Sequence, residues 1–296
     1  MKNDFKHKVV VVTGATGGIG RALSWRFATA GARIVLIDLD TEQLSALQNQ
    51  VERSGTEVLS IECDITDYER CQAAMQEVVD RFGGIDVLIN NAGISHHSQF
   101  PETDMSVFRE IMEVNYFGAI HCTKAALDSL VQRRGMIISM SSTGGFAPML
   151  GRVAYSASKH ALHGLFESLR VELKESGVRV MIVCPGATAT DMRKTTMDGA
   201  GNPLELPTDA AGSVASPPDV ADAVYRGAVD NRRILIHSKM SKRDWFYWKF
   251  FPALFEYKLY KQQQANIAHH ITSITSDQEV THGNISLLLF IQLVFE

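Results

Sequence analysis

The chain of 296 residues has only four cysteines, little net charge and no apolar signal segment at its N-terminus. No two cysteines have CxxC spacing, which argues against a disulfide framework and a metal site and favours buried thiols in a reducing compartment. The formal net charge of −4 provides no general attraction to nucleic acid, so we expect no nucleic-acid partner. Because a signal segment is absent, we expect a cytoplasmic protein.

Apolar runs alternate with helix-length amphipathic segments along most of the chain. Runs that are apolar on both faces and joined by helical crossovers predict an α/β fold with a doubly wound parallel sheet, covered by helices on both sides. We expect one domain over residues 1–240, followed by an extension over 241–296. The predicted strands are 9–12, 34–37, 58–61, 87–89, 136–140, 178–183 and 234–236.

A glycine-rich turn follows the first predicted strand and opens a helical pattern. Its sequence is Thr13-Gly-Ala-Thr-Gly-Gly-Ile-Gly20. Glycines permit close backbone approach, and the free N–H groups of a helix N-terminus face an anion, so these parts suit a dinucleotide pyrophosphate. A bare glycine cluster would indicate only a tight turn, whereas this cluster has the position of a nucleotide-binding turn.

An acidic residue, Asp38, ends the second predicted strand, eighteen residues after Gly20. At this position a carboxylate can accept hydrogen bonds from the adenosine ribose hydroxyls, and it would repel a 2′-phosphate. We therefore expect the cofactor to be NAD rather than NADP. A solvated aspartate at a strand end is the simpler alternative.

A possible proton-transfer pair lies in the sequence Tyr155-Ser-Ala-Ser-Lys159. On a helix, the four-residue spacing places the phenol and the ammonium on one face, where the cation would favour the phenolate and lower the pKa of Tyr155. Ser142, thirteen residues before Tyr155, follows an apolar run and could hydrogen-bond the same substrate oxygen. The spacing alone also occurs by chance on solvated helices.

Together these motifs resemble the short-chain dehydrogenase/reductase family, over about residues 8–236. Further matching motifs are Cys63-Asp64-Ile65, Asn90-Asn-Ala-Gly93, Asn115, Pro185-Gly186 and Thr190. The resemblance implies a Rossmann fold and a catalytic set of Asn115, Ser142, Tyr155 and Lys159. In that set Tyr155 is the acid/base, Lys159 lowers its pKa and binds the nicotinamide ribose, Ser142 positions the substrate, and Asn115 supports a proton relay through water.

The resemblance also implies the residues that bind the cofactor. Asp64 and Ile65 would flank the adenine, Asn91 to Gly93 would line the groove, and Thr188 and Thr190 would hold the carboxamide side of the nicotinamide. The full implied set is Gly14, Thr16, Gly18, Ile19, Gly20, Asp38, Asp64, Ile65, Asn91, Ala92, Gly93, Tyr155, Lys159, Pro185, Gly186, Thr188 and Thr190.

The glycine turn fits the patterns of two branches of the family, because residue 17 is also glycine. TGxxxGxG is typical of the shorter-chain dehydrogenases, and TGxxGxxG of the extended branch, which includes sugar-nucleotide epimerases. The Asn90–Gly93 motif and the tandem Ser141-Ser142 resemble the shorter-chain branch, and the chain leaves little room for a sugar-nucleotide domain. We therefore favour the NAD-preferring shorter-chain branch.

Three regions are candidates for substrate contact. Ser142, Tyr155 and the neighbouring Phe146 are the predicted substrate-binding residues, although Phe146 could equally be a core residue. The glycine- and proline-containing segment 191–216 is interpreted as a mobile substrate lid. His96 and His97 follow the Asn90–Gly93 motif on a loop and could contact substrate, although they are interpreted first as surface residues of the loop.

The extension contains an aromatic and basic segment, 242–261, with nine aromatic residues, five bases and two acids. Such a segment can lie at a lipid interface, or it can pack over the substrate cleft or a subunit neighbour, divided at Pro252. The apolar stretch 285–295 is too short to span a bilayer as a helix.

The leading functional hypothesis is an oxidoreductase that transfers a hydride between NAD(H) and a hydrophobic secondary alcohol or ketone, which is steroid-, retinoid- or lipid-like. Two alternatives are a non-catalytic NAD-binding sensor or scaffold and an adaptor that associates with membranes through 242–261. The family resemblance suggests a homodimer or homotetramer.

Overall fold

The computed structural model describes residues 5–190, 196–204 and 214–264 of the chain. The chain divides into two compact units, Met1–Phe250 and Phe251–Glu296, and the described part of the second unit is the helix 252–264. The predicted lid is therefore described only in part, because residues 191–195 and 205–213 lie outside the described ranges.

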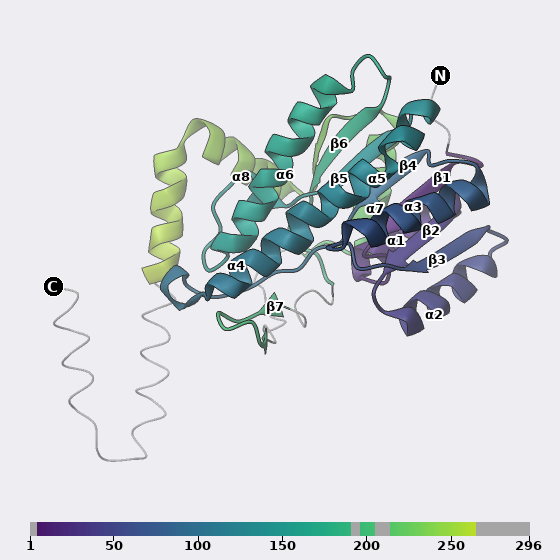
Figure 1. Ribbon diagram of the computed structural model, residues 1–296. Helices are drawn as coiled ribbons and strands as arrows, with labels where there is room; N and C mark the ends of the chain where they lie inside the picture. The colour runs from purple at the N-terminus through teal and green to yellow at the C-terminus, as the bar shows by residue number, and fades with distance from the viewer. Residues whose placement is uncertain (1–4, 191–195, 205–213, 265–296) are drawn as a thin grey trace. The chain divides into compact units, whose positions relative to one another are not determined.

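A seven-stranded parallel sheet forms the centre of the first unit (Figure 1). Its strand order is β3-β2-β1-β4-β5-β6-β9. Strands β1 to β3 are therefore added towards one edge of the sheet, and β4, β5, β6 and β9 are added from β1 towards the other edge. The predicted doubly wound fold is confirmed, and each predicted strand is present. The strands are β1 (Val9–Thr13), β2 (Arg33–Asp38), β3 (Val58–Glu62), β4 (Val87–Asn90), β5 (Met136–Met140), β6 (Arg179–Cys184) and β9 (Ile234–Ile236).

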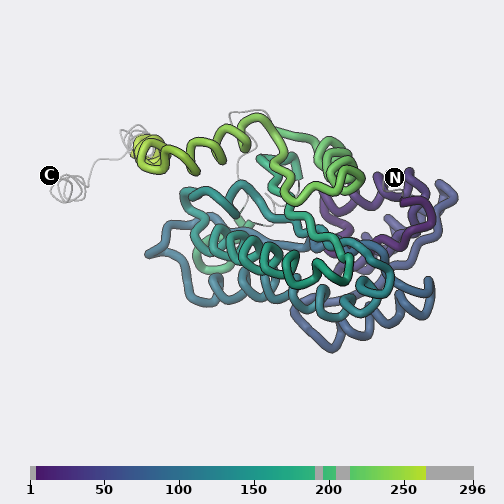
Figure 2. The backbone as a smooth tube through the Cα atoms, turned by 90° about the horizontal axis from the view of Figure 1, so that it is seen from above, coloured from purple at the N-terminus to yellow at the C-terminus, as the bar shows by residue number. Residues whose placement is uncertain are grey.

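Both faces of the sheet are buried under helices. Successive side chains of a strand point to opposite faces, so each strand contributes to two cores. Val9 and Val11 of β1 belong to one core, and Val10 and Val12 belong to the other. Figure 2 shows the two helix layers on opposite sides of the sheet. One layer contains α1 (Gly18–Ala28), α2 (Thr41–Glu52) and α7 (Pro217–Val229), and the other contains α3 (Tyr68–Phe82), α5 (Gly118–Arg133) and α6 (Val153–Glu172).

Side chains cap the N-termini of several helices. Asp40 accepts a hydrogen bond from the Gln43 N–H at the start of α2, and Asp67 accepts one from Arg70 at the start of α3. Ser216 caps α7 by accepting a hydrogen bond from the Asp219 N–H, as its place before Pro217 predicts. The N-cap of α1 is Gly17, which supplies no side-chain hydrogen bond.

The described part of the predicted lid is a small antiparallel pair, β7 (Thr196–Met197) and β8 (Pro203–Leu204). Met197 exchanges backbone hydrogen bonds with Ser95 and His97, and its side chain packs against α4 (Met105–Met112) through Val107 and Ile111. These residues are held against the loop that follows β4, and motion of the lid remains a prediction.

The polypeptide after β9 forms α8 (Lys239–Phe250), and the helical conformation is interrupted at Phe251, directly before Pro252. The prediction that Pro252 divides the segment agrees with this break, because the residue before a proline is disfavoured in helices. Among the described helices, none is long and apolar enough to cross a membrane.

Candidate active site

The predicted site residues gather where the parallel strands end, which is the edge at which doubly wound folds bind ligands. Asp38 is the last residue of β2. The loops that leave β1, β4, β5 and β6 carry Gly14, Asn91, Ser142 and Pro185, respectively. The reversal of strand order between β1 and β4 opens this edge. The topology therefore brings together residues that lie far apart in the sequence.

The turn between β1 and α1 requires glycine at two positions. Gly14 has a φ of +62°, and a Cβ there would lie 2.7 Å from the Ala92 Cα. A Cβ on Gly20 would lie 2.0 Å from the Gly14 carbonyl oxygen. The turn thus packs backbone against backbone, and the uncapped N-terminus of α1 suits an anionic group such as a pyrophosphate.

Thr13, a residue absent from the sequence-based site, joins this turn to β4. Its buried hydroxyl accepts hydrogen bonds from the N–H groups of Asn91 and Ala92, at 3.0 and 3.1 Å. The Asn91 amide donates in turn to the carbonyl oxygens of Thr13 and Gly14, at 2.9 and 3.0 Å. Asn91 therefore supports the turn. Thr13 is the first residue of the glycine motif, and this position could have indicated its role from the sequence.

Asp38 makes contact with the same turn. One of its carboxylate oxygens accepts hydrogen bonds from the Thr16 N–H at 2.9 Å and from the Thr16 hydroxyl at 2.7 Å. The other accepts a hydrogen bond from the Leu39 N–H at 2.8 Å. The carboxylate thus sits beside the turn, at the place where the ribose of a bound dinucleotide is expected.

Asp64 and Ile65 lie on the loop after β3, at the same edge. The Asp64 carboxylate accepts hydrogen bonds from the N–H and hydroxyl of Thr66, which shape the loop. Ile65 packs against Gly118 at the start of α5, where an added Cβ would lie 2.5 Å from its side chain. Its carbonyl also contacts the His121 ring at 2.9 Å.

Asn115 is buried in a π-helical turn, Glu113–Phe117, between α4 and α5. Its side chain accepts a hydrogen bond from the Ile94 N–H at 2.8 Å, and donates to the Ile94 carbonyl at 3.0 Å and to the Ser158 hydroxyl at 2.9 Å. The Ser158 hydroxyl donates to the Tyr155 carbonyl at 2.8 Å. Asn115 therefore connects the loop after β4 to the helix that carries Tyr155.

Lys159 lies on α6, one helical turn after Tyr155, and is buried. Its ammonium donates a hydrogen bond to the Met140 carbonyl at 3.0 Å and lies 5.7 Å from the centre of the Tyr155 ring. A Cβ on Gly93 would lie 3.2 Å from the Lys159 Nζ, so glycine leaves room for the ammonium. Burial lowers the pKa of Lys159 to about 8.

Tyr155 is only 8% exposed and forms a hydrogen bond with Ser142. Burial raises the pKa of Tyr155 above its ordinary value, because the phenolate loses hydration, and the smaller lowering effects of Ser142 and the Arg152 charge do not compensate. In the described structure the Lys159 ammonium contacts the Met140 carbonyl, so a lowering of the Tyr155 pKa by Lys159 stays a prediction.

Arg152 is a second residue that the sequence reasoning missed. It is the N-cap residue of α6, three residues before Tyr155, and its guanidinium donates a hydrogen bond to the Ser95 hydroxyl. Its positive charge lowers the pKa of Tyr155 and of the neighbouring His96. The spacing of three residues between Arg152 and Tyr155, which places two side chains near each other on a helix, could have indicated this role.

His96 is fully buried, so its interpretation as a surface residue is wrong, whereas His97 is exposed. The backbone of His96 forms a β-bridge with Met197, which covers the loop. In the part of the chain that the structure describes, neither ring nitrogen of His96 has a hydrogen-bond partner. Burial, followed by the charge of Arg152, lowers the pKa of His96 to about 4, so the ring is neutral at pH 7.

The loop after β6 completes the described edge of the site. The Thr190 side chain lies over α1, where a Cβ on Gly18 would approach it to 3.1 Å. Gly186 lies against Ser238 and Ser241, and the Ser241 hydroxyl is 3.0 Å from that of Thr143, next to Ser142. Ser241 was assigned to the extension, but it is buried within the first unit and supports two active-site loops.

The candidate substrate residue Phe146 has a different environment from Ser142 and Tyr155. It is partly buried and packs against the core on the side of α3, α5 and α6. Met149 lies near Tyr155, because the Cβ position of Gly144 is 2.7 Å from the Met149 sulfur and 3.4 Å from a Tyr155 ring carbon.

A sequence model of the family described as short chain dehydrogenase matches residues 8–200. The chain belongs to the short-chain dehydrogenase family. A mouse relative named dehydrogenase/reductase SDR family member 7B is 39% identical over 234 residues, which are 76% of this chain and 72% of the relative. A zebrafish relative of the same name is 32% identical over 263 residues, which are 85% and 84% of the two chains.

Two solved structures share the fold. A short chain dehydrogenase/reductase from Burkholderia phymatum in complex with NAD has a TM-score of 0.72 at 24% identity, and covers 79% of this chain and 90% of its own. An alcohol dehydrogenase from Thermococcus sibiricus complexed with 5-hydroxy-NADP has a TM-score of 0.67 at 27% identity, and covers 78% and 94%. The first similarity concerns the fold alone.

Family membership defines the general chemistry. The chain is an oxidoreductase that acts on CH–OH groups of a small substrate and uses a nicotinamide dinucleotide. The residues of the turn fit such a cofactor, because Gly14 and Gly20 let the backbone close up and the N-terminus of α1 is uncapped. The two structures of similar fold are complexes with NAD and with 5-hydroxy-NADP, respectively.

Proposed function

We propose that this short-chain dehydrogenase uses NAD(H) to interconvert a hydrophobic secondary alcohol, which is steroid-, retinoid- or lipid-like, and its ketone. The observation that carries the proposal is the hydrogen-bonded pair of buried Tyr155 and partly buried Ser142 at the nucleotide-binding edge of the sheet. A protein that only bound NAD would have no need for a phenol paired with a hydroxyl there.

Tyr155 is the group that moves the proton. The raised pKa of Tyr155 keeps the phenol protonated at neutral pH, which is the form that donates a proton to a carbonyl oxygen during reduction. For oxidation the phenol must first lose this proton, so we expect the oxidation rate to rise with pH. The bound nicotinamide supplies the hydride exchange with the substrate carbon.

The other residues bind and orient. Ser142, already hydrogen-bonded to Tyr155, would donate to the same substrate oxygen and fix its distance from the phenol. Asn115 holds the loop of Ile94 and, through Ser158, the helix turn of Tyr155. Lys159 would bind the nicotinamide ribose, and its ammonium lies within the same buried group.

The preference for NAD rests on Asp38. Its carboxylate lies at the end of β2 beside the glycine turn, where it would accept hydrogen bonds from ribose hydroxyls and repel a 2′-phosphate. Its contacts with Thr16 keep the negative charge at this position. Titration of the protein with NADH and with NADPH tests the preference directly.

The proposed apolar substrate has support from the side chains near Tyr155. Met149 lies beside Gly144 and the tyrosine ring, and Met197 packs on α4 through Val107 and Ile111. Methionine is flexible and adapts to apolar ligands of irregular shape. A panel of secondary alcohols and ketones of increasing hydrophobicity, followed by NADH absorbance, identifies the substrate class.

Replacement of the catalytic phenol tests the mechanism. We expect Tyr155→Phe to abolish turnover and to leave NADH binding intact, because only the phenol oxygen is lost. The matched control is Tyr225→Phe on α7, whose ring packs with Phe5 and Phe27 in the other helix layer. Retained turnover in Tyr155→Phe removes Tyr155 from this role, and NADH binding without turnover in the native protein supports the sensor alternative.

The ionisation of Tyr155 has a separate spectroscopic test. Phenolate absorbance of the native protein minus that of Tyr155→Phe should reveal a titration above the ordinary tyrosine pKa of about 10. A midpoint below that value would show that a cation, rather than burial, controls the phenol.

A further inference from the structure

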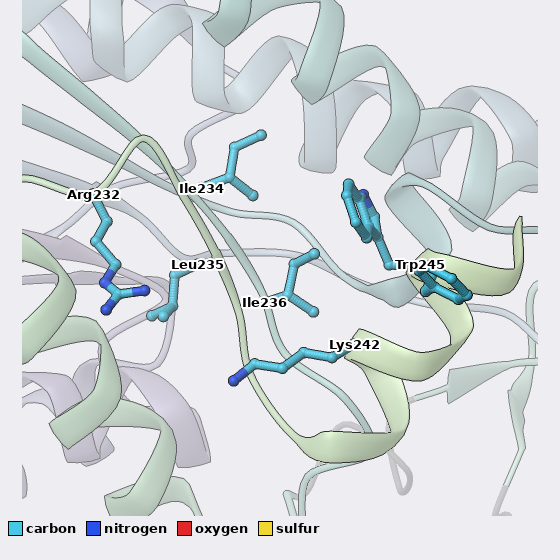
Figure 3. Close-up of a pocket in the computed structure, with 7 residues that line it drawn as sticks. Arg232, Ile234, Leu235, Ile236, Lys242 and Trp245 are labelled. Atoms are coloured by element: carbon cyan, nitrogen blue, oxygen red, sulfur yellow. The ribbon is translucent and has the colours of Figure 1, made fainter. Parts of the chain in front are cut away.

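A groove lies between β9, the edge strand of the sheet, and α8 (Figure 3). It has a volume of about 440 Å³, which falls within the range of about 300–1,000 Å³ that small-molecule sites occupy. Its lining includes Arg232, Ile234, Ile236, Lys242, Trp245 and Phe246. None of these residues belongs to the Tyr155 site.

The wall of the groove is apolar. Ile234 and Ile236 project from the same side of β9, and Trp245 comes from α8 (Figure 3). Ile234 is 40% exposed and Phe246 is 48% exposed, although both are large apolar residues. Exposed apolar side chains that surround a cavity indicate a surface that meets a ligand, a partner or a membrane.

Two positive side chains accompany this apolar wall. Arg232 precedes β9, Lys242 lies in the first turn of α8, and both are exposed. Within the described ranges, no carboxylate forms an ion pair with either of them, whereas Arg226 pairs with Asp222 at 2.7 Å. The groove therefore combines an apolar wall with two positive charges and no negative one.

The aromatic and basic character continues along α8. Positions 242, 245, 246, 249 and 250 follow the i, i+3, i+4 pattern, so they share one face of the helix. The Lys249 ammonium lies 4.9 Å from the Trp245 ring centre, and Phe246 contacts Phe250 with ring centres 5.1 Å apart. Rings interspersed with lysines are typical of helices at the headgroup zone of a bilayer.

We propose that the groove between β9 and α8 docks the protein on a membrane surface by binding anionic phospholipid. The headgroup charge pairs with Arg232 and Lys242, and the apolar part contacts Ile234, Ile236 and Trp245. A free anion would use only the two charges and leave the apolar wall in water. A second copy of the chain is disfavoured, because a two-fold contact brings the same positive patch against itself.

The test uses the full chain and vesicles of phosphatidylcholine, with or without phosphatidylserine. We expect sedimentation with the anionic vesicles and little with neutral ones. The double variant Arg232→Gln/Lys242→Gln should bind about 30-fold more weakly, since each base near an anionic surface contributes on the order of fivefold. The matched control, Lys124→Gln/Lys174→Gln, removes two exposed lysines from α5 and from the segment after α6 and should bind normally.

A fluorescence measurement locates the contact. A variant with Trp25→Phe and Trp248→Phe retains Trp245 alone of the three tryptophans. Its fluorescence should be quenched by anionic vesicles with brominated acyl chains. Absent quenching, equal binding to neutral vesicles, or equal binding by the two double variants would each overturn the proposal.

Self-association is the competing outcome. If Arg232→Gln/Lys242→Gln changes the molar mass in light scattering and leaves vesicle binding unaltered, the groove is an interface between copies and the lipid proposal is wrong. Turnover of a soluble substrate should be the same in both double variants. A failure of lipid binding therefore leaves the proposed dehydrogenase activity untouched.

Discussion

The hydroxyl of Thr13 offers the sharpest test of how the nucleotide-binding turn is held. It accepts hydrogen bonds from the N–H groups of Asn91 and Ala92 and is almost completely buried. Thr13→Val keeps the shape of the side chain but removes the acceptor. Thr13→Ser keeps the acceptor and removes only a methyl group.

The expected magnitudes follow from these contacts. A buried N–H without a partner costs about 1–3 kcal/mol, and here two N–H groups lose theirs. Because Asn91 and Ala92 are only partly buried and water can reach them, we expect the free energy of unfolding of Thr13→Val to fall by about 2–4 kcal/mol. Thr13→Ser should lose about 1 kcal/mol, the value of one buried methyl group.

Urea unfolding followed by circular dichroism measures both variants, and NADH fluorescence measures the affinity for the nucleotide. We expect Thr13→Val to bind NADH more weakly than Thr13→Ser, because Asn91 also holds the carbonyl oxygens of the turn. If the two variants unfold at the same urea concentration and bind NADH equally, the hydroxyl does not support the turn and the reasoning fails.

Three further predictions concern the same site. Asp38→Asn should raise the affinity for NADPH relative to NADH by about tenfold, or 1.4 kcal/mol, because the repulsion of a 2′-phosphate is lost. The control Asp40→Asn, at the N-cap of α2, should leave both this ratio and the stability nearly unchanged, because asparagine caps a helix about as well as aspartate. Lys159→Met should be more stable than the native protein at pH 7, because the lowered pKa of Lys159 means that burial of the charged ammonium opposes folding. This advantage should shrink as the pH rises from about 8 towards the ordinary pKa of lysine. Urea unfolding at a series of pH values measures it. Gly20→Ala should destabilise the turn and abolish NADH binding, since its Cβ would lie 2.0 Å from the Gly14 carbonyl oxygen. The control Gly164→Ala in α6, with no atom within 4 Å of its Cβ, should be neutral or more stable by up to about 1 kcal/mol. Equal melting temperatures of the two variants would contradict this prediction.

The fold could be predicted because its signals are local. Strands of a parallel sheet are buried on both faces, so they read as continuous apolar runs, and Val9 to Val12 supply both cores. A serine followed by two prolines is a similar local signal, and Ser216 is the N-cap of α7. The four cysteines are buried free thiols, as their spacing indicated.

Burial, in contrast, could not be derived from local spacing. The interval between Tyr155 and Lys159 shows that they share a helix face, but the pKa of the phenol depends on how much water surrounds it and on which atom the ammonium contacts. His96 was assigned to a surface loop because β7, whose Met197 forms a bridge with it, lies far from it in the sequence.

The sequence by itself determined which residues form strands, where the glycine turn lies and which side chains can take part in proton transfer, because periodicity and residue type act over a few neighbouring positions. Only the tertiary structure decided that Thr13 supports the turn, that Ser241 lies beneath two active-site loops, and that burial outweighs charge at Tyr155. Each of these depends on contacts between segments far apart in the chain, and desolvation arises only when such segments pack together.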